Sequence, residues 1–226
     1  MTSKPPPTPP LRPSREGRTK WRVLRFGRTR RAPIAVTLRP LRAVVLAIDS
    51  ARKSGWALYD RGTLVAYGEC AANIAHQRDH VIATALRTAE AATLRAAIAV
   101  ETPFGGALQT IVSLATSAAL WRDTWRAHGE PIRACLDVQA GEWRRHLFGS
   151  GKMPRDAARR LEQLTAQRIV HQHQPAIGLA DIGPDAAAAI CFGYVARSSV
   201  ELQSALRCDI IDSSKLLRPT TGGTRS

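Results

Sequence analysis

The sequence predicts an α/β fold with a central five-stranded mixed sheet, a meander of three strands followed by two parallel strands, flanked by helices. Two observations support this fold class. Residues 44–48 and 96–100 are continuous apolar runs, as in strands that are buried on both faces. Between them come two short strand-like segments and a helix-like segment of about twenty residues, a spacing that suits a hairpin followed by a right-handed crossover.

The elements follow in a clear order along the chain. After the first apolar strand, residues 55–59 and 63–67 form short strands around the turn Asp60-Arg-Gly. An Ala- and Leu-rich helix precedes the second apolar strand, at about residues 75–95. The rest of the chain predicts a helix at 108–128, a strand at 132–138, a helix at 140–147, a basic helix after the turn 149–152, and a last helix with Pro184 in its first turn.

Composition limits the class of protein. The chain has 226 residues, a formal net charge of +15 and a pI of about 11.0. No apolar run reaches the roughly eighteen residues that a membrane span needs, and the first twenty residues lack the apolar segment of a secretory signal. The four cysteines are far apart with no Cys-x-x-Cys pair, so we expect reduced thiols, a cytoplasmic protein and no membrane partner.

The positive charge is concentrated at the start of the chain. Residues 1–42 contain twelve Lys or Arg, eight of the fourteen prolines, and Glu16 as their only acid. Such a segment buries too little apolar surface to fold, so we predict a disordered tail. We place the folded domain at residues 43–206 and a C-terminal extension at 207–226.

A polybasic tail favours sequence-independent contact with nucleic-acid phosphates, although a solubilising arm would have the same composition.

An acid follows each of the two apolar strands, Asp49 after the first and Glu101 after the second. If the strands are parallel neighbours, their carboxyl ends lie side by side at the edge where α/β folds bind ligands. Two carboxylates on strands about 4.8 Å apart repel each other unless a divalent cation lies between them, and Mg²⁺ prefers oxygen ligands. Either acid alone could instead end a strand or pair with an arginine.

Other motifs have simpler interpretations. The turn Gly-Ser-Gly-Lys at 149–152 has His146 and Met153 where a Walker phosphate loop needs Gly and Ser or Thr, so a basic loop that grips a nucleic-acid backbone fits better. The histidine pairs have no neighbouring Cys or acid cluster and are expected at the surface or at helix ends: His76 and His80, His171 and His173. Three tryptophans at helical spacing are expected in the core or in a dimer interface: Trp121, Trp125 and Trp143.

Taken in order, these residues resemble the RuvC family of Holliday-junction resolvases, which belongs to the RNase H-like (retroviral integrase) superfamily. The resemblance rests on Asp49 closing a first strand, Ser54-Gly55-Trp56 opening the second, Val100-Glu101 with Phe104, and Asp185-Ala-Ala in a late helix. The stretch WRRHLFGSGKMPRDAA, residues 143–158, is similar to the family's basic segment. The resemblance covers roughly residues 43–200 and implies an RNase H-like fold.

The resemblance also implies a function. It suggests a metal-dependent crossover junction endodeoxyribonuclease that hydrolyses phosphodiester bonds of branched DNA in recombination and repair, working as a homodimer. Its catalytic and metal-binding acids would be Asp49, Glu101 and Asp185, holding two Mg²⁺ ions or Mn²⁺ in their place. Arg144 and Arg155 take the places of two DNA-contacting lysines, and the neighbouring basic residues Lys152 and Arg145 would also contact the nucleic acid.

The sequence departs from the family pattern at two places. Ser50-Ala51 stands where the family usually has Pro-Gly after its first Asp, and the late helix lacks one of two acids spaced three residues apart. Either Ile182 occupies the first place and Asp185 the second, or Asp185 is first and Ala188 second. In the first case Asp181, in the loop before the helix, is a candidate fourth metal ligand, and in the second case one metal would be held weakly. An acid at Asp185 is also favoured by the helix macrodipole alone.

The missing acid leaves other functions open. A catalytically impaired RNase H-like protein would bind structured DNA without cutting it. An RNase H-like domain with another role, such as RNA processing, is a third hypothesis. Half of an actin-like ATPase is disfavoured, because the chain is too short for a second phosphate-binding lobe.

Overall fold

The described part of the chain forms a five-stranded sheet with five helices. In the computed structural model, the described residues are 39–103, 107–129, 134–175, 182–200, 202–204 and 206, all within the compact unit Ala32–Ser226. The elements are β1 (Ala43–Asp49), β2 (Lys53–Asp60), β3 (Thr63–Ala71), α1 (Ala75–Ala91), β4 (Arg95–Thr102), α2 (Leu108–Ala127), β5 (Cys135–Gln139), α3 (Ala140–Phe148), α4 (Arg155–His173) and α5 (Pro184–Ala196).

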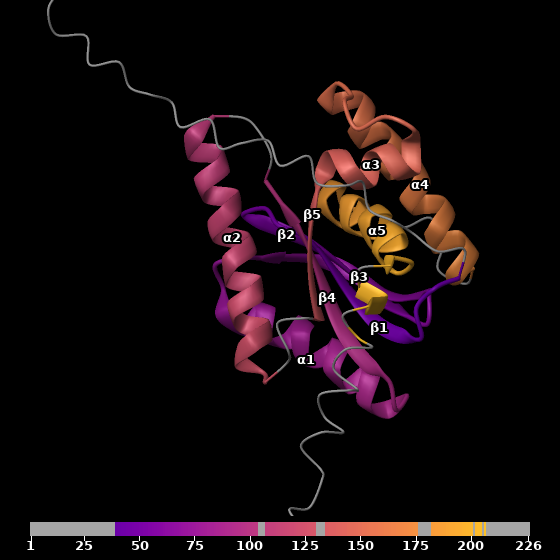
Figure 1. The fold of residues 1–226 in the computed structure, drawn as a ribbon. Coiled ribbons are helices and arrows are strands. Elements are labelled where there is room, and N and C mark those ends of the chain that lie inside the picture. Colours follow the sequence, from indigo (N-terminus) through magenta and orange to yellow (C-terminus); the bar gives the residue numbers. More distant parts are fainter. Residues whose placement is uncertain are drawn as a thin grey trace, which may run out of the picture. The chain divides into compact units, whose positions relative to one another are not determined.

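The strand order in the sheet is β3-β2-β1-β4-β5 (Figure 1). The first three strands form an antiparallel meander, and β1, β4 and β5 are parallel neighbours. This arrangement confirms the predicted mixed sheet. Helix α1 ends at Ala91, earlier than predicted, because the chain turns at Thr93 with a φ of 54° and β4 already begins at Arg95. Of the predicted strand 132–138, residues 132 and 133 lie outside the described residues.

Helices cover both faces of the sheet. Because side chains alternate along a strand, Val44, Leu46 and Ile48 of β1 pack toward α1 and α2, whereas Val45 and Ala47 pack toward α5. Helices α3, α4 and α5 lie together on this second side of the sheet, opposite α1 and α2 (Figure 1). The face on which a β1 or β4 side chain lies therefore decides which helices it meets.

The core explains several predicted features. The side chains of Trp121, Trp125 and Trp143 are fully buried, so the prediction that they belong to the core is confirmed. Cys70, Cys135 and Cys191 are free thiols, as predicted, and Cys208 lies outside the described residues. Among the described helices, none is both long enough and apolar enough to cross a bilayer.

The start of the described chain joins the fold just before β1. Leu41 is 5% exposed, and its backbone N–H donates to the carbonyl of Arg197 after α5 at 2.8 Å. Residues 1–38 of the predicted tail and the predicted extension at 207–226 lie outside the described residues. The domain bounds therefore stay a prediction.

Candidate active site at the carboxyl edge of the sheet

Asp49 and Glu101 end neighbouring parallel strands and lie on the same face of the sheet. In the β1–β4 register, Ile48 pairs with Val100, so the two acids are the next residues along adjacent strands. Alternation from Ala47 and Ala99, which pack toward α5, places both acids on the α5 side. The structure thus brings together the two acids that the sequence placed at one sheet edge.

Asp185 reaches the same edge from helix α5. It lies in the first turn of the helix, after Pro184, as predicted. The backbone at Asp185 rests on Gly55 of β2: a Cβ added to Gly55 would lie 1.8 Å from the carbonyl oxygen of Asp185. Gly55 is the register partner of Asp49. The absence of a side chain at Gly55 therefore lets the start of α5 approach the strand that carries Asp49.

The acids interact electrostatically. Burial raises the pKa of Asp49 well above its ordinary value, and the charges of Glu101 and Asp185 raise it further, while Arg144 opposes the shift. Burial also raises the pKa of Glu101 to about 6, against the lowering effect of Arg144 and of a hydrogen bond from Trp143. Like charges that share a partly buried site resist ionisation. A bound cation would relieve this repulsion.

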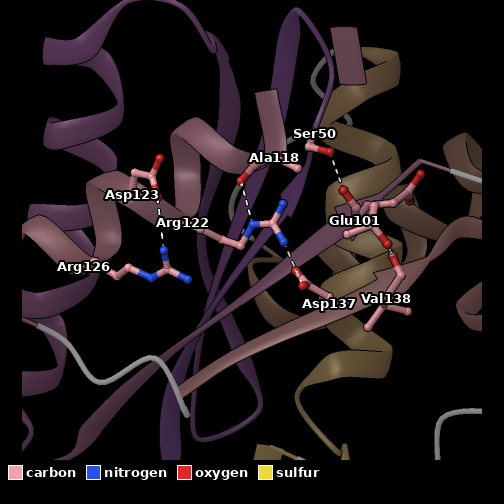
Figure 2. A network of polar contacts seen from close by, with 9 residues as sticks. Ser50, Glu101, Ala118, Arg122, Asp123, Arg126, Asp137 and Val138 are labelled. Atoms are coloured by element: carbon pink, nitrogen blue, oxygen red, sulfur yellow. Dashed lines mark hydrogen bonds and ion pairs between the residues drawn. The ribbon is translucent and has the colours of Figure 1, made fainter. Parts of the chain in front are cut away.

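Two hydrogen bonds hold Glu101 in place. The indole N–H of Trp143, in α3, donates to Oε2 of Glu101 at 2.7 Å. The hydroxyl of Ser50 donates to the backbone carbonyl of Glu101, as Figure 2 shows. Ser50 therefore links the end of β1 to the end of β4.

Arg144 lies between the acids and a further buried carboxylate. Its Nε donates to Oε1 of Glu162, in α4, at 2.7 Å, and its guanidinium carbon lies 5.0 Å from the ring centroid of Trp143. Glu162 is only 2% exposed. Arg144, predicted as a phosphate contact, is thus already bound to a buried acid, and it lowers the pKa of both Asp49 and Glu101.

The other predicted nucleic-acid contacts are exposed and lie close together in the sequence, in α3, in the turn after it and at the start of α4: Arg145, Lys152 and Arg155. Helix α3 ends at Phe148 and is followed by Gly149, whose φ of 74° is the left-handed conformation that glycine adopts without strain. A Cβ on Gly151 would lie 2.2 Å from the carbonyl oxygen of Gly141. The glycines therefore fold the basic turn back onto the start of α3.

Sequence reasoning missed two acids near this site, Glu162 and Glu69. Glu162 left a signal, because it occupies an otherwise apolar stripe at helical spacing with Ala158 and Ala166. A charged residue in such a stripe needs a buried partner. Glu69 left none: β3 is half-buried along most of its length, and nothing in its pattern marks this position.

Oxygen ligands and excess negative charge at Asp49, Glu101 and Asp185 suit a hard divalent cation such as Mg²⁺. Within the described ranges, no three His, Cys, Asp or Glu side chains already form a group that could hold a metal ion. Asp181 lies outside the described residues. The two positions where the resemblance allows another acid, Ile182 and Ala188, are each 5% exposed.

Comparisons with solved structures identify similar chains. The RuvC structure from Thermus thermophilus matches with 16% identity and a TM-score of 0.44, over 67% of this chain and 92% of that one. T. thermophilus RuvC in complex with a Holliday junction substrate matches with 16% identity and a TM-score of 0.45, over 68% and 91%. The yeast mitochondrial Holliday junction resolvase Ydc2 matches with 9% identity and a TM-score of 0.35, over 80% and 89%. No protein-family model and no curated protein matches the chain.

Proposed function

We propose that the chain is a metal-dependent endonuclease that hydrolyses phosphodiester bonds of branched DNA and resolves Holliday junctions in recombination and repair. The observation that carries the proposal is the placement of Asp49 and Glu101. They end adjacent parallel strands on one face, and Asp185 enters beside them from α5. Three acids at the carboxyl edge of an α/β sheet suit phosphodiester chemistry with Mg²⁺.

The acids would hold two Mg²⁺ ions, or Mn²⁺, with Asp181 as a candidate fourth ligand. Bound there, the cations would lower the pKa of a water that attacks the phosphate, and their positive charge would stabilise the leaving 3′ oxygen. The protein's own contribution is orientation. Trp143 fixes one carboxylate oxygen of Glu101, and Ser50 holds the backbone of Glu101.

Basic residues beside the acids would bind the DNA backbone. Lys152, Arg155 and Arg145 are exposed, and an arginine can fork onto two phosphate oxygens. Arg144 could bind Glu162 and a phosphate at the same time. Only its Nε donates in the hydrogen bond to Glu162, so the other N–H groups of the guanidinium would serve the phosphate. The basic segment 1–42 would add sequence-independent affinity.

A homodimer fits this substrate. A four-way junction offers two strands for symmetric cutting, and a two-fold pair of identical active sites matches that symmetry. Sedimentation of the full chain should give a mass of about twice 24.6 kDa. A monomer that still cuts both strands at once would contradict the dimer.

A protein that binds junctions without cutting them is the second candidate. It is favoured by the buried apolar side chains of Ile182 and Ala188, because the resemblance expects a second acid at one of these two positions. An ion pair between Arg144 and Glu162 also neutralises part of the local charge without any metal.

The two candidates differ in one experiment. Labelled four-way junctions, flaps, linear duplexes and RNA–DNA hybrids are incubated with the full chain, with Mg²⁺ and with EDTA. Symmetric nicks in the four-way junction that require Mg²⁺ support the nuclease. Tight junction binding with no product, in Mg²⁺ and in Mn²⁺, supports the binding protein. Preferential cutting of the RNA–DNA hybrid would contradict the junction as substrate.

A further inference from the structure

Helix α5 begins without a capping side chain of its own. Its N-cap is Gly183, which has no side chain, and Pro184 follows as the first helical residue. The first backbone N–H groups of a helix have no partner within the helix and are usually satisfied by a side chain at the N-cap. Another element must supply the acceptor here.

The acceptor comes from β3. Oε1 of Glu69 accepts hydrogen bonds from the backbone N–H groups of Asp185, at 3.1 Å, and Ala186, at 3.2 Å. These are the second and third residues of α5, the positions that an N-cap side chain normally serves. Glu69 therefore caps α5 from more than a hundred residues earlier in the chain.

Glu69 belongs to the same row of the sheet as Asp49. In the strand register, Asp49 of β1 pairs with Gly55 of β2, and Gly55 pairs with Glu69 of β3. The carbonyl of Asp185 rests on Gly55, the middle member of the row. The start of α5 is thus seated between the strand that carries Asp49 and the carboxylate that caps the helix.

Close packing leaves this helix start little freedom. A Cβ added to Gly183 would lie 2.1 Å from Oε1 of Glu69, and one added to Gly55 would lie 1.8 Å from the carbonyl oxygen of Asp185. The φ of Gly183 is −58°, so glycine matters there for space and not for conformation, because a side chain at this position would displace the Glu69 carboxylate. Contacts on two sides therefore fix the helix start.

Both oxygens of Glu69 are already used. Oε1 serves the two amides, and Oε2 forms an ion pair with Lys53 of β2. The side chain of Glu69 is 15% exposed and that of Lys53 is 65% exposed. A carboxylate with both oxygens engaged is poorly placed to bind a cation itself. Lys53 offsets the negative charge that Glu69 brings near Asp185.

We propose that Glu69 is a positioning residue of the active site, which holds the first turn of α5 so that Asp185 faces the strand end that carries Asp49. This inference rests on the proposed function, in which Asp185 is a metal ligand and its position therefore matters. Glu69 acts through the backbone of Asp185 and does not contact substrate. Lys53 supports Glu69 from the neighbouring strand.

The test compares Glu69→Ala with Glu69→Gln, which keeps an acceptor oxygen for the two amides. Glu90→Ala, at an exposed position of α1, is the matched control. Hydrogen exchange at Asp185 and Ala186 should be about fivefold or more faster in Glu69→Ala, because a lost cap frees the first turn. Its affinity for Mn²⁺, measured by calorimetry on the full chain, should fall by about tenfold.

Cleavage kinetics give a further readout. Glu69→Ala should lower kcat for a four-way junction by about tenfold or more and leave KM within about twofold. Glu69→Gln should retain most of the exchange protection, Mn²⁺ affinity and kcat, and Glu90→Ala should match the wild type. If Glu69→Ala does not fold, Gly183→Ala displaces the Glu69 carboxylate without removing it, and should shift exchange and Mn²⁺ affinity in the same direction.

The outcomes separate this inference from the proposed function. Faster exchange in Glu69→Ala with unchanged Mn²⁺ affinity and kcat would overturn positioning and leave a cap that only stabilises the helix. A wild-type chain that cuts no branched DNA, but whose Mn²⁺ affinity depends on Glu69, would overturn the nuclease and support the positioning role. A wild-type chain that binds no Mn²⁺ would overturn both.

Discussion

Arg144 and Glu162 form an ion pair between α3 and α4, in which the guanidinium Nε donates to Oε1 at 2.7 Å. The side chain of Glu162 is 3% exposed and that of Arg144 is 26% exposed. The charge of Arg144 also lowers the pKa of Asp49 and of Glu101. One arginine therefore balances a buried acid and moderates the repulsion within the candidate active site.

Removing Arg144 should destabilise the fold. Arg144→Ala leaves Glu162 buried without its cation, and breaking a buried pair from one side costs about 3 kcal/mol or more. Urea unfolding of the metal-free protein should show this loss. Arg145→Ala, the exposed neighbour on the same helix, should change the free energy of unfolding by less than about 0.5 kcal/mol.

A double variant tests the cause of that loss. Arg144→Met with Glu162→Leu removes both charges, so it should recover most of the stability, because well-packed apolar residues can replace a buried ion pair. If Arg144→Ala is as stable as the wild type, the ion pair does not hold α3 to α4 in solution.

Asp49→Asn should abolish cleavage and leave junction binding within about twofold, because it keeps the shape of the side chain but removes the charge that holds a cation. Gel-based cleavage and fluorescence anisotropy on the same junction measure the two effects. Asp123→Asn removes one charge from an exposed position of α2 and should behave like the wild type. Wild-type cutting by Asp49→Asn would place the active site elsewhere.

Removing residues 1–38 should weaken binding to every DNA. This segment carries ten Lys or Arg and one acid, which is +9 of the net charge of +15. Each phosphate contact adds about 0.9 to the dependence of log affinity on log salt, so the slope should flatten for junctions and linear duplexes alike. A full-length variant with the ten basic residues replaced by Gln controls for length. Equal slopes in all three proteins would show that the tail does not contact phosphates.

His173, at the end of α4, should reduce stability in mild acid, and this contribution is opposite in sign to that of Asp49 and Glu101, whose raised pKa values favour the folded state as pH falls. Its Nδ1 accepts the backbone N–H of Leu64 at 2.6 Å, and its ring packs edge-on against Tyr59. Burial, helped by the charge of Arg197, lowers the pKa of His173 below its ordinary value. The unfolded chain then binds a proton at this side chain more readily than the folded one, so the contribution of His173 to the free energy of unfolding decreases as pH falls below about 6.5 and until the folded pKa is passed.

His173→Gln should remove this contribution, so its free energy of unfolding should rise relative to that of the wild type as pH falls, measured by urea unfolding between about pH 7.5 and 5. His171→Gln, at an exposed position two residues earlier on the same helix, should keep the wild-type slope. A difference in the free energy of unfolding between His173→Gln and the wild type that stays constant with pH would contradict this role of His173.

The sequence was sufficient to place Asp49 and Glu101. Both follow apolar runs, and the period of two along a strand, together with parallel pairing, fixes their edge and their face. The same reasoning predicted the strand directions and the Pro184 helix start. These features depend on local pattern and on a few topological rules, which a single sequence contains.

The partners of those acids were beyond sequence reasoning. Trp143 was expected in the core or in a dimer interface, and it lies in the core, but its hydrogen bond to Glu101 depends on how α3 packs against the sheet. The pairing of Arg144 with Glu162 depends on the contact between two helices, and the cap from Glu69 on the register of three strands. Such contacts are set by tertiary packing, which propensity and periodicity do not encode.

Asp185 can be a metal ligand or an ordinary helix-start acid, and the two roles respond differently to one substitution. An acid in the first turn contributes about 0.3–1 kcal/mol through the macrodipole with no catalytic role. Asp185→Asn keeps an acceptor but weakens a site for a hard cation, so the free energy of unfolding should change by less than about 1 kcal/mol. Cleavage at low Mg²⁺ should fall by orders of magnitude if Asp185 is a ligand.

Asp156→Asn is the matched control for Asp185→Asn, because Asp156 also lies in the first turn of its helix, α4, directly after the first helical residue. It should show the same small change in stability with wild-type cleavage. Asp181→Asn should lower activity if the loop acid is the fourth ligand, and Mn²⁺, which accepts poorer geometry, should restore part of it. Full activity of Asp185→Asn at saturating junction and low Mg²⁺ would leave Asp185 a structural residue and remove the third acid from the site.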